Sequence, residues 1–307
     1  MILLFPGQGS QKPGMAKDLA EAFPAARDVF DRADEAVGVS LSRLCFDGPA
    51  EELTLTHNAQ PALLAHGAAV WAVVRDKLQS TVQGAAGHSL GEFSAYHAAG
   101  SIDLEDALTL VRRRGYLMYE SGVQTPGAMA AILGEMSRTV EEICREASSA
   151  GVVVPANYNT TEQIVISGEV AAVEKAMGLA KDAGAKRALR LPVSGAFHSP
   201  LMAPAADGLK TALDAARWRD PSVPVWSNVT AEAVGDATLA KHLLHQQLTS
   251  AVRWVEVVRN MAARFPGTTF VEMGPGAVLS GLVKRLAPDC TTMTCGTVAE
   301  VEALLAL

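Results

Sequence analysis

The chain has 307 residues, of which 49% are hydrophobic and 19% charged, a composition that can bury a sizeable globular core. Its formal net charge of −7, without a long lysine or arginine run, argues against nucleic acid and membrane lipid as partners. Four cysteines without a C-x-x-C pair exclude a disulfide framework, and we see neither a signal-peptide pattern nor an apolar run of about 18 residues, so we expect a cytoplasmic protein.

The first hundred residues predict strands that alternate with helices around a glycine-rich turn. The apolar run at 2–5 stops at Pro6-Gly7, which is typical of a buried parallel strand that enters a loop. A weaker strand at 82–86 leads into the segment 87–91, and the small-residue helix that follows ends near Gly100. Helices are expected between these strands, over residues 15–37 and 61–78.

The next helix, expected over 103–120 and capped by Asp103, has a charged residue on its apolar side. Arg114 follows Leu110 by four positions and precedes Met118 by four, so the three side chains share one face. A guanidinium on an apolar face needs an anion. Two interpretations stay open: an internal ion pair with Asp or Glu, or a clamp for a substrate carboxylate.

Residues 123–193 form a separate predicted unit, because their elements follow the order β-α-β-β-α-β of a ferredoxin-like fold. The strands are expected at 128–133, 152–156, 163–167 and 188–193, and the helices at 140–148 and 170–183. This small subdomain would be inserted into a large α/β domain that consists of residues 1–122 and 194–307. The large domain resumes with helices at 204–216, 239–248 and 254–265 and strands at 223–227 and 269–273.

Gly87-His88-Ser89-Leu90-Gly91 fits the G-x-S-x-G pattern of a nucleophile elbow. Such a motif turns sharply from a strand into a helix and lifts the serine hydroxyl out of the sheet. Ser89 would then lie at a helix N-terminus, where free N–H groups favour a developing anion. The predicted fold class is therefore α/β, with an α/β-hydrolase-like core around a mainly parallel sheet and the inserted ferredoxin-like subdomain.

A serine nucleophile needs a base, and His198 is the histidine placed best for that role. It lies in a loop between a strand and a helix, where site residues concentrate. His88 is adjacent to the serine on a tight turn and would point away from it. His57, His66 and His97 lie in or beside predicted helices and are interpreted as structural. His242 and His245 have i, i+3 spacing, but no third metal ligand accompanies them, so they are interpreted as part of a solvated helix face.

The elbow is one of several short motifs that are distributed along nearly the whole chain. They are Phe5-Pro6-Gly7-Gln8-Gly9-Ser10-Gln11, Gly87-His88-Ser89-Leu90-Gly91-Glu92, Arg114-Gly115 with Met118, Asn157-Tyr158-Asn159 with Ile166-Ser167-Gly168, Gly195-Ala196-Phe197-His198, Gln247-Leu248 and Glu272-Met273-Gly274-Pro275-Gly276. In this order they resemble the malonyl-CoA:acyl carrier protein transacylase family. Together they are far more specific than any one of them.

The resemblance implies a catalytic role for five residues. Ser89 would be the acylated nucleophile, His198 its base, and Gln247 the residue whose backbone carbonyl orients that histidine. The backbone N–H groups of Gln8 and Leu90 would form the oxyanion hole. This arrangement would replace the acid of a hydrolase triad with a carbonyl oxygen.

For the substrate, the resemblance implies that Arg114 pairs with a malonyl carboxylate and that Phe197 is the bulky residue of malonyl-selective members. The implied reaction is ping-pong transfer of malonyl from malonyl-CoA to the phosphopantetheine thiol of acyl carrier protein in fatty-acid synthesis, without a metal or another cofactor. Lys284-Arg285 and Lys186-Arg187 with Arg190 could dock this acidic carrier. The resemblance also favours a monomer.

Other functions share parts of the pattern. A free-standing acyltransferase of polyketide assembly and a malonyltransferase subunit of malonate decarboxylase would look nearly the same. A serine thioesterase or hydrolase would share the elbow but carry an acidic triad member and a histidine nearer the carboxyl terminus. An inactive subunit that only docks carrier proteins is disfavoured, because the catalytic side chains are all present.

Overall fold

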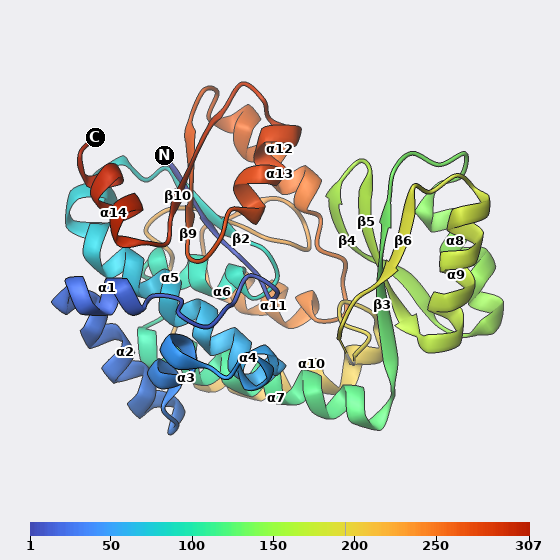
Figure 1. Cartoon of the computed structure of the whole chain (residues 1–307), viewed down its shortest axis with the longest axis horizontal. Coiled ribbons are helices and arrows are strands. Elements are labelled where there is room, and N and C mark those ends of the chain that lie inside the picture. The colour runs from blue at the N-terminus through green and yellow to red at the C-terminus, as the bar shows by residue number, and fades with distance from the viewer. Residues whose placement is uncertain (194) are drawn as a thin grey trace.

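The computed structural model describes residues 1–193 and 195–307, which contain two β-sheets (Figure 1). The six-stranded sheet has the order β10-β9-β1-β2-β7-β8 and is parallel except where β8 pairs with β7. Its strands are β1 (Ile2–Phe5), β2 (Gly84–Gly87), β7 (Val225–Trp226), β8 (Ala233–Val234), β9 (Thr269–Met273) and β10 (Thr291–Cys295). The mixed α/β class with a mainly parallel sheet is therefore confirmed.

Helices cover both faces of this sheet, and β1 shows why its sequence is apolar throughout. Leu3 and Phe5 lie in one core cluster with α5 (Thr56–Leu78) and α7 (Leu104–Gln124). Ile2 and Leu4 lie in a second cluster with α12 (Trp254–Arg264) and α13 (Val278–Leu286). Successive side chains of a strand point to opposite faces, so a strand buried on both faces loses the polar alternation.

The remaining helices of this part surround the same sheet. They are α1 (Lys17–Ala22), α2 (Pro24–Val37), α3 (Leu41–Asp47), α4 (Ala50–Thr54), α6 (Gly91–Ala98), α10 (Ala203–Ala215), α11 (Ala237–Gln247) and α14 (Val298–Leu305), with short 3₁₀ turns at Gln79–Thr81 and Pro200–Met202. Within the described ranges, no helix is both long enough and apolar enough to cross a bilayer.

Three helical predictions differ from the structure in their details. The segment predicted as one helix over 15–37 is two helices, because Pro24 starts α2 and holds Phe23 in an extended conformation. Helix α5 begins at Thr56, ahead of Pro61, which removes one backbone donor without ending the helix. Asp103 occupies the N-cap position of α7, but its carboxylate accepts from Arg219 instead of capping the helix.

The four-stranded antiparallel sheet lies beside the parallel one, with the order β4-β5-β3-β6 (Figure 1). Its elements are β3 (Gly127–Leu133), α8 (Val140–Ala147), β4 (Val153–Thr160), β5 (Gln163–Glu169), α9 (Val170–Asp182) and β6 (Arg187–Arg190), with a 3₁₀ turn at Ser148–Ala150. These elements have the predicted order and their own apolar cluster. The division into domains at residues 122/123 and 193/194 stays a prediction.

Two glycines allow β2 to turn back tightly into α6. A Cβ atom on Gly87 would overlap the backbone of Gly91, and a Cβ atom on Gly91 would overlap the carbonyl oxygen of Phe5. The chain can therefore double back under Ser89 only because both positions lack a side chain.

We expect Gly87→Ala to lower the free energy of unfolding by about 3 kcal/mol or more, because backbone atoms cannot move aside as a flexible side chain can. Gly178→Ala is the matched control: nothing lies within 4 Å of a Cβ there, in the middle of α9. That change should raise stability by about 0.5–1 kcal/mol through helix propensity. Urea unfolding of both variants checks the pair, and similar values for the two would contradict the steric argument.

Candidate active site

Ser89 lies at the turn between β2 and α6, at the carboxyl end of the parallel strands. Its φ of 52° is left-handed, a conformation that costs a residue with a Cβ about 1–3 kcal/mol and persists only where the surroundings enforce it. The enforcing contacts come from Asn228: its Oδ1 accepts from the Ser89 N–H at 2.7 Å, and its Nδ2 donates to the Gly87 carbonyl at 2.8 Å. The elbow is thus held from outside the motif.

His198 comes from the loop before α10 and points at the elbow. Its Nε2 lies 2.8 Å from Ser89 Oγ, while its Nδ1 lies 2.9 Å from the Gln247 carbonyl oxygen and 3.2 Å from that of Ser250. Carbonyl oxygens only accept, so Nδ1 carries the hydrogen and Nε2 presents its lone pair to the serine hydroxyl. Burial and the nearby Arg114 charge lower the pKa of His198 to about 3, which keeps the imidazole neutral.

Arg114 approaches the same hydroxyl from α7 and is 1% exposed. Its Nη2 donates to Ser89 Oγ at 3.1 Å and to Gln247 Oε1 at 2.9 Å, and its Nη1 donates to Gln60 Oε1 at 2.8 Å. The guanidinium also lies over the Phe93 ring. These partners are all neutral, and none of the ion pairs among the described residues includes Arg114. Of the two interpretations of this arginine, the internal ion pair is therefore not found.

A buried carboxylate connects these groups from behind. Glu92 Oε2 accepts from the Asn228 N–H at 3.0 Å and from Gln247 Nε2 at 2.7 Å, and that same amide nitrogen donates to the Ser89 carbonyl at 3.0 Å. Burial raises the pKa of Glu92 to about 7, although both hydrogen bonds and the Arg114 charge oppose the rise. Glu92 makes no hydrogen bond to Ser89, His198 or Arg114, so it is linked to them through Gln247 and Asn228 and, in the case of Arg114, through charge attraction across the intervening amide.

The two residues predicted to donate to the oxyanion come from different segments, the loop after β1 and the residue directly after Ser89. Leu90 is buried at the start of α6, and Gln8 is half-buried in the loop after β1. Neither backbone N–H donates to an acceptor in the part of the chain that the structure describes. Gln8 also lines a cleft of about 600 Å³ with Leu55, Tyr119, Arg190 and the segment 191–193. Both backbone N–H groups thus lack an acceptor among the described residues, and Gln8 lies beside a cleft that opens to solvent.

Phe197 and His88 have separate positions at the edge of the site. Phe197 is buried directly before His198 and lies against Gly195. His88 points away from the hydroxyl, as predicted, and its Nε2 lies 2.8 Å from Asn159 Oδ1 on β4. No group of three metal-binding side chains occurs among residues 1–193 and 195–307.

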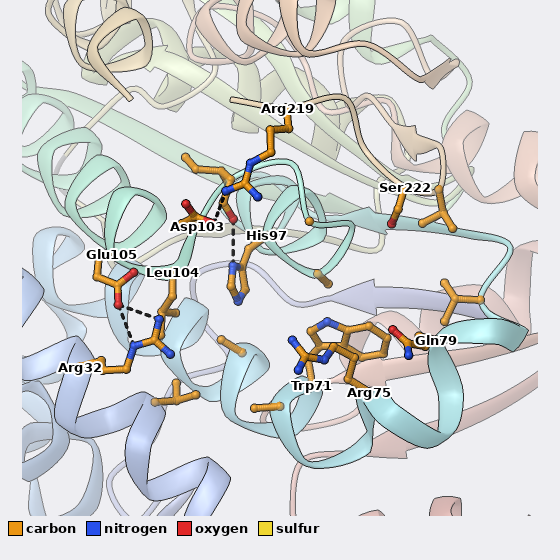
Figure 2. Close-up of a pocket in the computed structure, with 18 residues that line it drawn as sticks. Arg32, Trp71, Arg75, Gln79, His97, Asp103, Leu104, Glu105, Arg219 and Ser222 are labelled. Carbon is orange, nitrogen blue, oxygen red and sulfur yellow. Dashed lines mark hydrogen bonds and ion pairs between the residues drawn. The ribbon is translucent and has the colours of Figure 1, made fainter. Parts of the chain in front are cut away.

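A second cavity, of about 630 Å³, lies at the far end of α6 (Figure 2). Figure 2 shows two of its three arginines paired with carboxylates that also line the cavity, Arg32 with Glu105 and Arg219 with Asp103. The His97 imidazole contacts a backbone carbonyl, 3.1 Å from its Nδ1, and lines this cavity. His97 therefore has the structural position expected of it.

Three residues of the network escaped sequence reasoning. Gln60 and Asn228 lie outside every matched motif, and Glu92 is only the last residue of one. The signal that could have found Gln60 is its place on the apolar side of α5, where an amide needs a partner. No sequence pattern marks Asn228 as part of the site, because it reaches Ser89 and Gly87 only through the pairing of β7 with β2.

Comparisons with known proteins identify the family of the whole chain. The acyl transferase domain family matches residues 2–300. The malonyl CoA-acyl carrier protein transacylase of Bacillus subtilis (strain 168) is 50% identical over 303 residues, covering 98% of this chain and 95% of that protein. An acyl-carrier-protein-S-malonyltransferase structure from Bartonella henselae is 45% identical with a TM-score of 0.95, covering 99% of this chain and 98% of that one.

A further solved structure contains a malonyl-transacylase in complex with its type II PKS acyl-carrier protein. It is 41% identical with a TM-score of 0.95, and the match covers 99% of this chain and 98% of that one. Both the sequence and the structural matches extend over essentially the whole chain. The chain therefore belongs to the malonyl-CoA:acyl carrier protein transacylase family of acyl transferase domains.

Proposed function

We propose that the protein transfers a malonyl group from malonyl-CoA to the phosphopantetheine thiol of acyl carrier protein through a malonyl-Ser89 intermediate. The observation that carries the proposal is the convergence of a hydroxyl, a neutral imidazole and an unneutralised guanidinium: Ser89 Oγ lies 2.8 Å from His198 Nε2 and 3.1 Å from Arg114 Nη2. The similar proteins named above carry malonyl, CoA and acyl carrier protein in their names, which supports the same substrates here.

In the first half-reaction, His198 Nε2 takes the Ser89 hydroxyl proton as Oγ attacks the thioester carbonyl carbon. The carbonyl π electrons move to its oxygen, where the N–H groups of Gln8 and Leu90 are the proposed donors. Loss of one such donor typically costs about 3–4 kcal/mol of barrier. The intermediate then expels the CoA sulfur, which takes the proton from the imidazolium and leaves malonyl-Ser89.

In the second half-reaction, the same imidazole removes the proton from the phosphopantetheine thiol. The sulfur attacks the ester carbon, and the Ser89 oxygen leaves and regains a proton from His198. The Gln247 and Ser250 carbonyls hold the Nδ1 hydrogen throughout, so the ring keeps its orientation in both half-reactions. General base catalysis of this kind is worth about 10²–10⁴-fold.

Arg114 is the proposed partner of the malonyl carboxylate, and buried Phe197 the proposed wall of the acyl pocket. A buried guanidinium that has only neutral partners gains most from an acyl group that carries an anion. An acetyl group would leave that charge unpaired, so it should be a poor substrate.

The contacts of His198 favour a transferase over the rival serine thioesterase or hydrolase. Nδ1 faces two carbonyl oxygens, where a hydrolase triad has a carboxylate. Fatty-acid synthesis is the proposed pathway. Polyketide assembly is the second candidate, because one similar structure is a complex with a type II PKS acyl-carrier protein.

The carrier protein is proposed to deliver its thiol through the cleft that Gln8 lines. Arg190 lines the same cleft and also pairs with Glu174 at 3.2 Å, and Lys186 and Arg187 are exposed near it in the sequence. Lys284 and Arg285 are exposed on the last turn of α13. These cations could steer an acidic partner toward a chain whose net charge is −7.

We also propose a ferredoxin-like subdomain and an α/β-hydrolase-like core. The βαββαβ order and the antiparallel pairing of residues 127–190 support a ferredoxin-like subdomain inserted at residues 123–193. The elbow at the end of β2 supports an α/β-hydrolase-like core formed by 1–122 and 194–307. We also propose a cytoplasmic monomer that uses malonyl-CoA as substrate and needs no other cofactor.

The intermediate is the first test. Incubation with malonyl-CoA should add one malonyl group to the intact mass of the wild-type protein and none to Ser89→Ala, and addition of holo acyl carrier protein should remove it. An adduct that disappears in buffer as fast as with carrier protein would favour the hydrolase. An adduct that persists in Ser89→Ala would contradict the assignment of the nucleophile.

We expect Arg114→Ala to lower kcat/KM for malonyl-CoA by about 10²–10³-fold and to narrow the gap to acetyl-CoA, because the carboxylate loses its partner. Arg113→Ala is the matched control: that arginine is exposed on the same helix. Initial rates with both CoA esters measure the effect. An equal loss for the two acyl groups would count against the clamp.

The lowered pKa of His198 predicts that the base form survives in mild acid. The rate of Ser89 acylation should therefore not fall through protonation of His198 as the pH is lowered from 8 to 5. A histidine with an ordinary pKa would lose half of its base form near pH 6.5. Because the pKa of Glu92 is about 7, its titration could also change the rate in this range. Single-turnover rates are therefore measured in the wild type and in Glu92→Gln, which lacks the titrating carboxyl. A limb near pH 6.5 in both proteins would contradict the prediction.

A further inference from the structure

The buried charge of Arg114 is held by amide oxygens at two points. Gln60 Oε1 accepts at 2.8 Å from Nη1, and Gln247 Oε1 accepts at 2.9 Å from Nη2. The Nε–H of the same guanidinium has no acceptor in the described part of the chain. Burial lowers the pKa of Arg114 to about 10, so the group stays charged at neutral pH although nothing in direct contact neutralises it.

Both amides are locked in the orientation that presents oxygen to Arg114. On α5, Gln60 is fully buried, and its Nε2 faces Met118 Sδ at 3.2 Å. On α11, Gln247 Nε2 donates to Glu92 and to the Ser89 carbonyl. Turning either amide over would aim its NH₂ at a guanidinium that can only donate. The arrangement is therefore fixed by its own chemistry.

Glutamate has the size of glutamine and is the usual partner of a buried arginine. A glutamate at position 60 would face the same guanidinium nitrogen and would neutralise it within the protein. The carboxylate of an acyl group would then have to displace that glutamate from Arg114 or share the guanidinium with it. Glu92, the carboxylate whose charge does act on Arg114, is kept one amide away, behind Gln247.

We propose that Gln60 is a specificity-determining residue: its neutral amide fixes Arg114 in place without neutralising it, which reserves the guanidinium charge for the carboxylate of the acyl group. The inference rests on the proposed malonyl transfer. It differs from a purely structural role, because charge and hydrogen-bonding capacity can be separated at this position. Glutamate keeps the acceptor and adds a charge, whereas methionine has a similar length but lacks both the charge and the amide.

The test compares kcat/KM for malonyl-CoA and acetyl-CoA in Gln60→Glu, Gln60→Met and the wild type. In Q60E the malonyl-to-acetyl ratio should fall by about 100-fold, while acetyl transfer stays within about threefold of the wild type or rises. In Q60M malonyl transfer should fall with no gain for acetyl, because Arg114 loses an anchor but not its charge. Gln79→Glu, an exposed position at the distant 3₁₀ turn, adds the same charge and should leave the ratio unchanged.

Two further measurements separate charge from misfolding. The unfolding midpoint of Q60E should equal or exceed that of the wild type, since the substitution supplies a counter-ion to a buried cation. Ser89 should still react with a neutral fluorophosphonate probe. If Q60E does not fold, Gln247→Glu with Glu92→Gln places a charge on the other side of the guanidinium without setting two carboxylates together, and this double variant should lower the same ratio relative to Glu92→Gln alone.

The outcomes distinguish the inference from the function on which it rests. If the wild type forms no malonyl-Ser89, the proposed function fails. If the wild type forms it and a folded Q60E keeps the wild-type preference for malonyl, the role of Gln60 is wrong. Equal losses for both acyl groups in a folded Q60E would likewise overturn it, because they would indicate a disturbed site instead of a neutralised cation.

Discussion

A buried guanidinium without a carboxylate beside it sets the conditions for the rest of this site. Arg114 is 1% exposed and contacts only neutral oxygens and an aromatic ring. A protein that buries a charge in this way gives up stability unless a ligand completes the pair. This buried charge explains the chemistry of the neighbouring groups. Each of them must accept a hydrogen bond from Arg114, or lie close to it, without carrying a charge that neutralises or repels the guanidinium.

The same constraint explains why His198 is oriented by carbonyl oxygens. A carboxylate at Nδ1 would raise the pKa of the imidazole and would lie close enough to attract the guanidinium. Carbonyl dipoles from Gln247 and Ser250 fix the tautomer with neither effect. Gln247 thus serves both groups at once, since its backbone orients the base and its side chain holds the arginine. Apart from the guanidinium itself, the side chain that contacts the reacting hydroxyl, His198, is neutral.

Local patterns predicted the parts of the fold and site that depend on nearby sequence. The apolar run at 2–5, the βαββαβ order and the place of Arg114 on the inner face of its helix follow from periodicity and glycine position. His198 was the preferred base on position, while the parts given to Gln247, Gln8 and Leu90 came from resemblance, because no local pattern marks a backbone carbonyl or N–H as functional. Gln60 and Asn228 stayed hidden, since their partners are brought together only by the packing of α5 on α7 and of β7 on β2.

The small unit takes part in the site through its backbone. The N–H of Tyr158 on β4 donates to the carbonyl of Val252 at 2.9 Å, and the N–H of Val252 donates to Ala156 at 2.8 Å. Val252 is two residues from Ser250, whose carbonyl faces His198 Nδ1. The antiparallel sheet is therefore hydrogen-bonded to the segment that orients the imidazole, and His88 adds a contact to Asn159 from the elbow itself. These three hydrogen bonds join the antiparallel sheet both to the segment that carries the Ser250 carbonyl and to the Ser89 turn, so we expect a displacement of that sheet to disturb both.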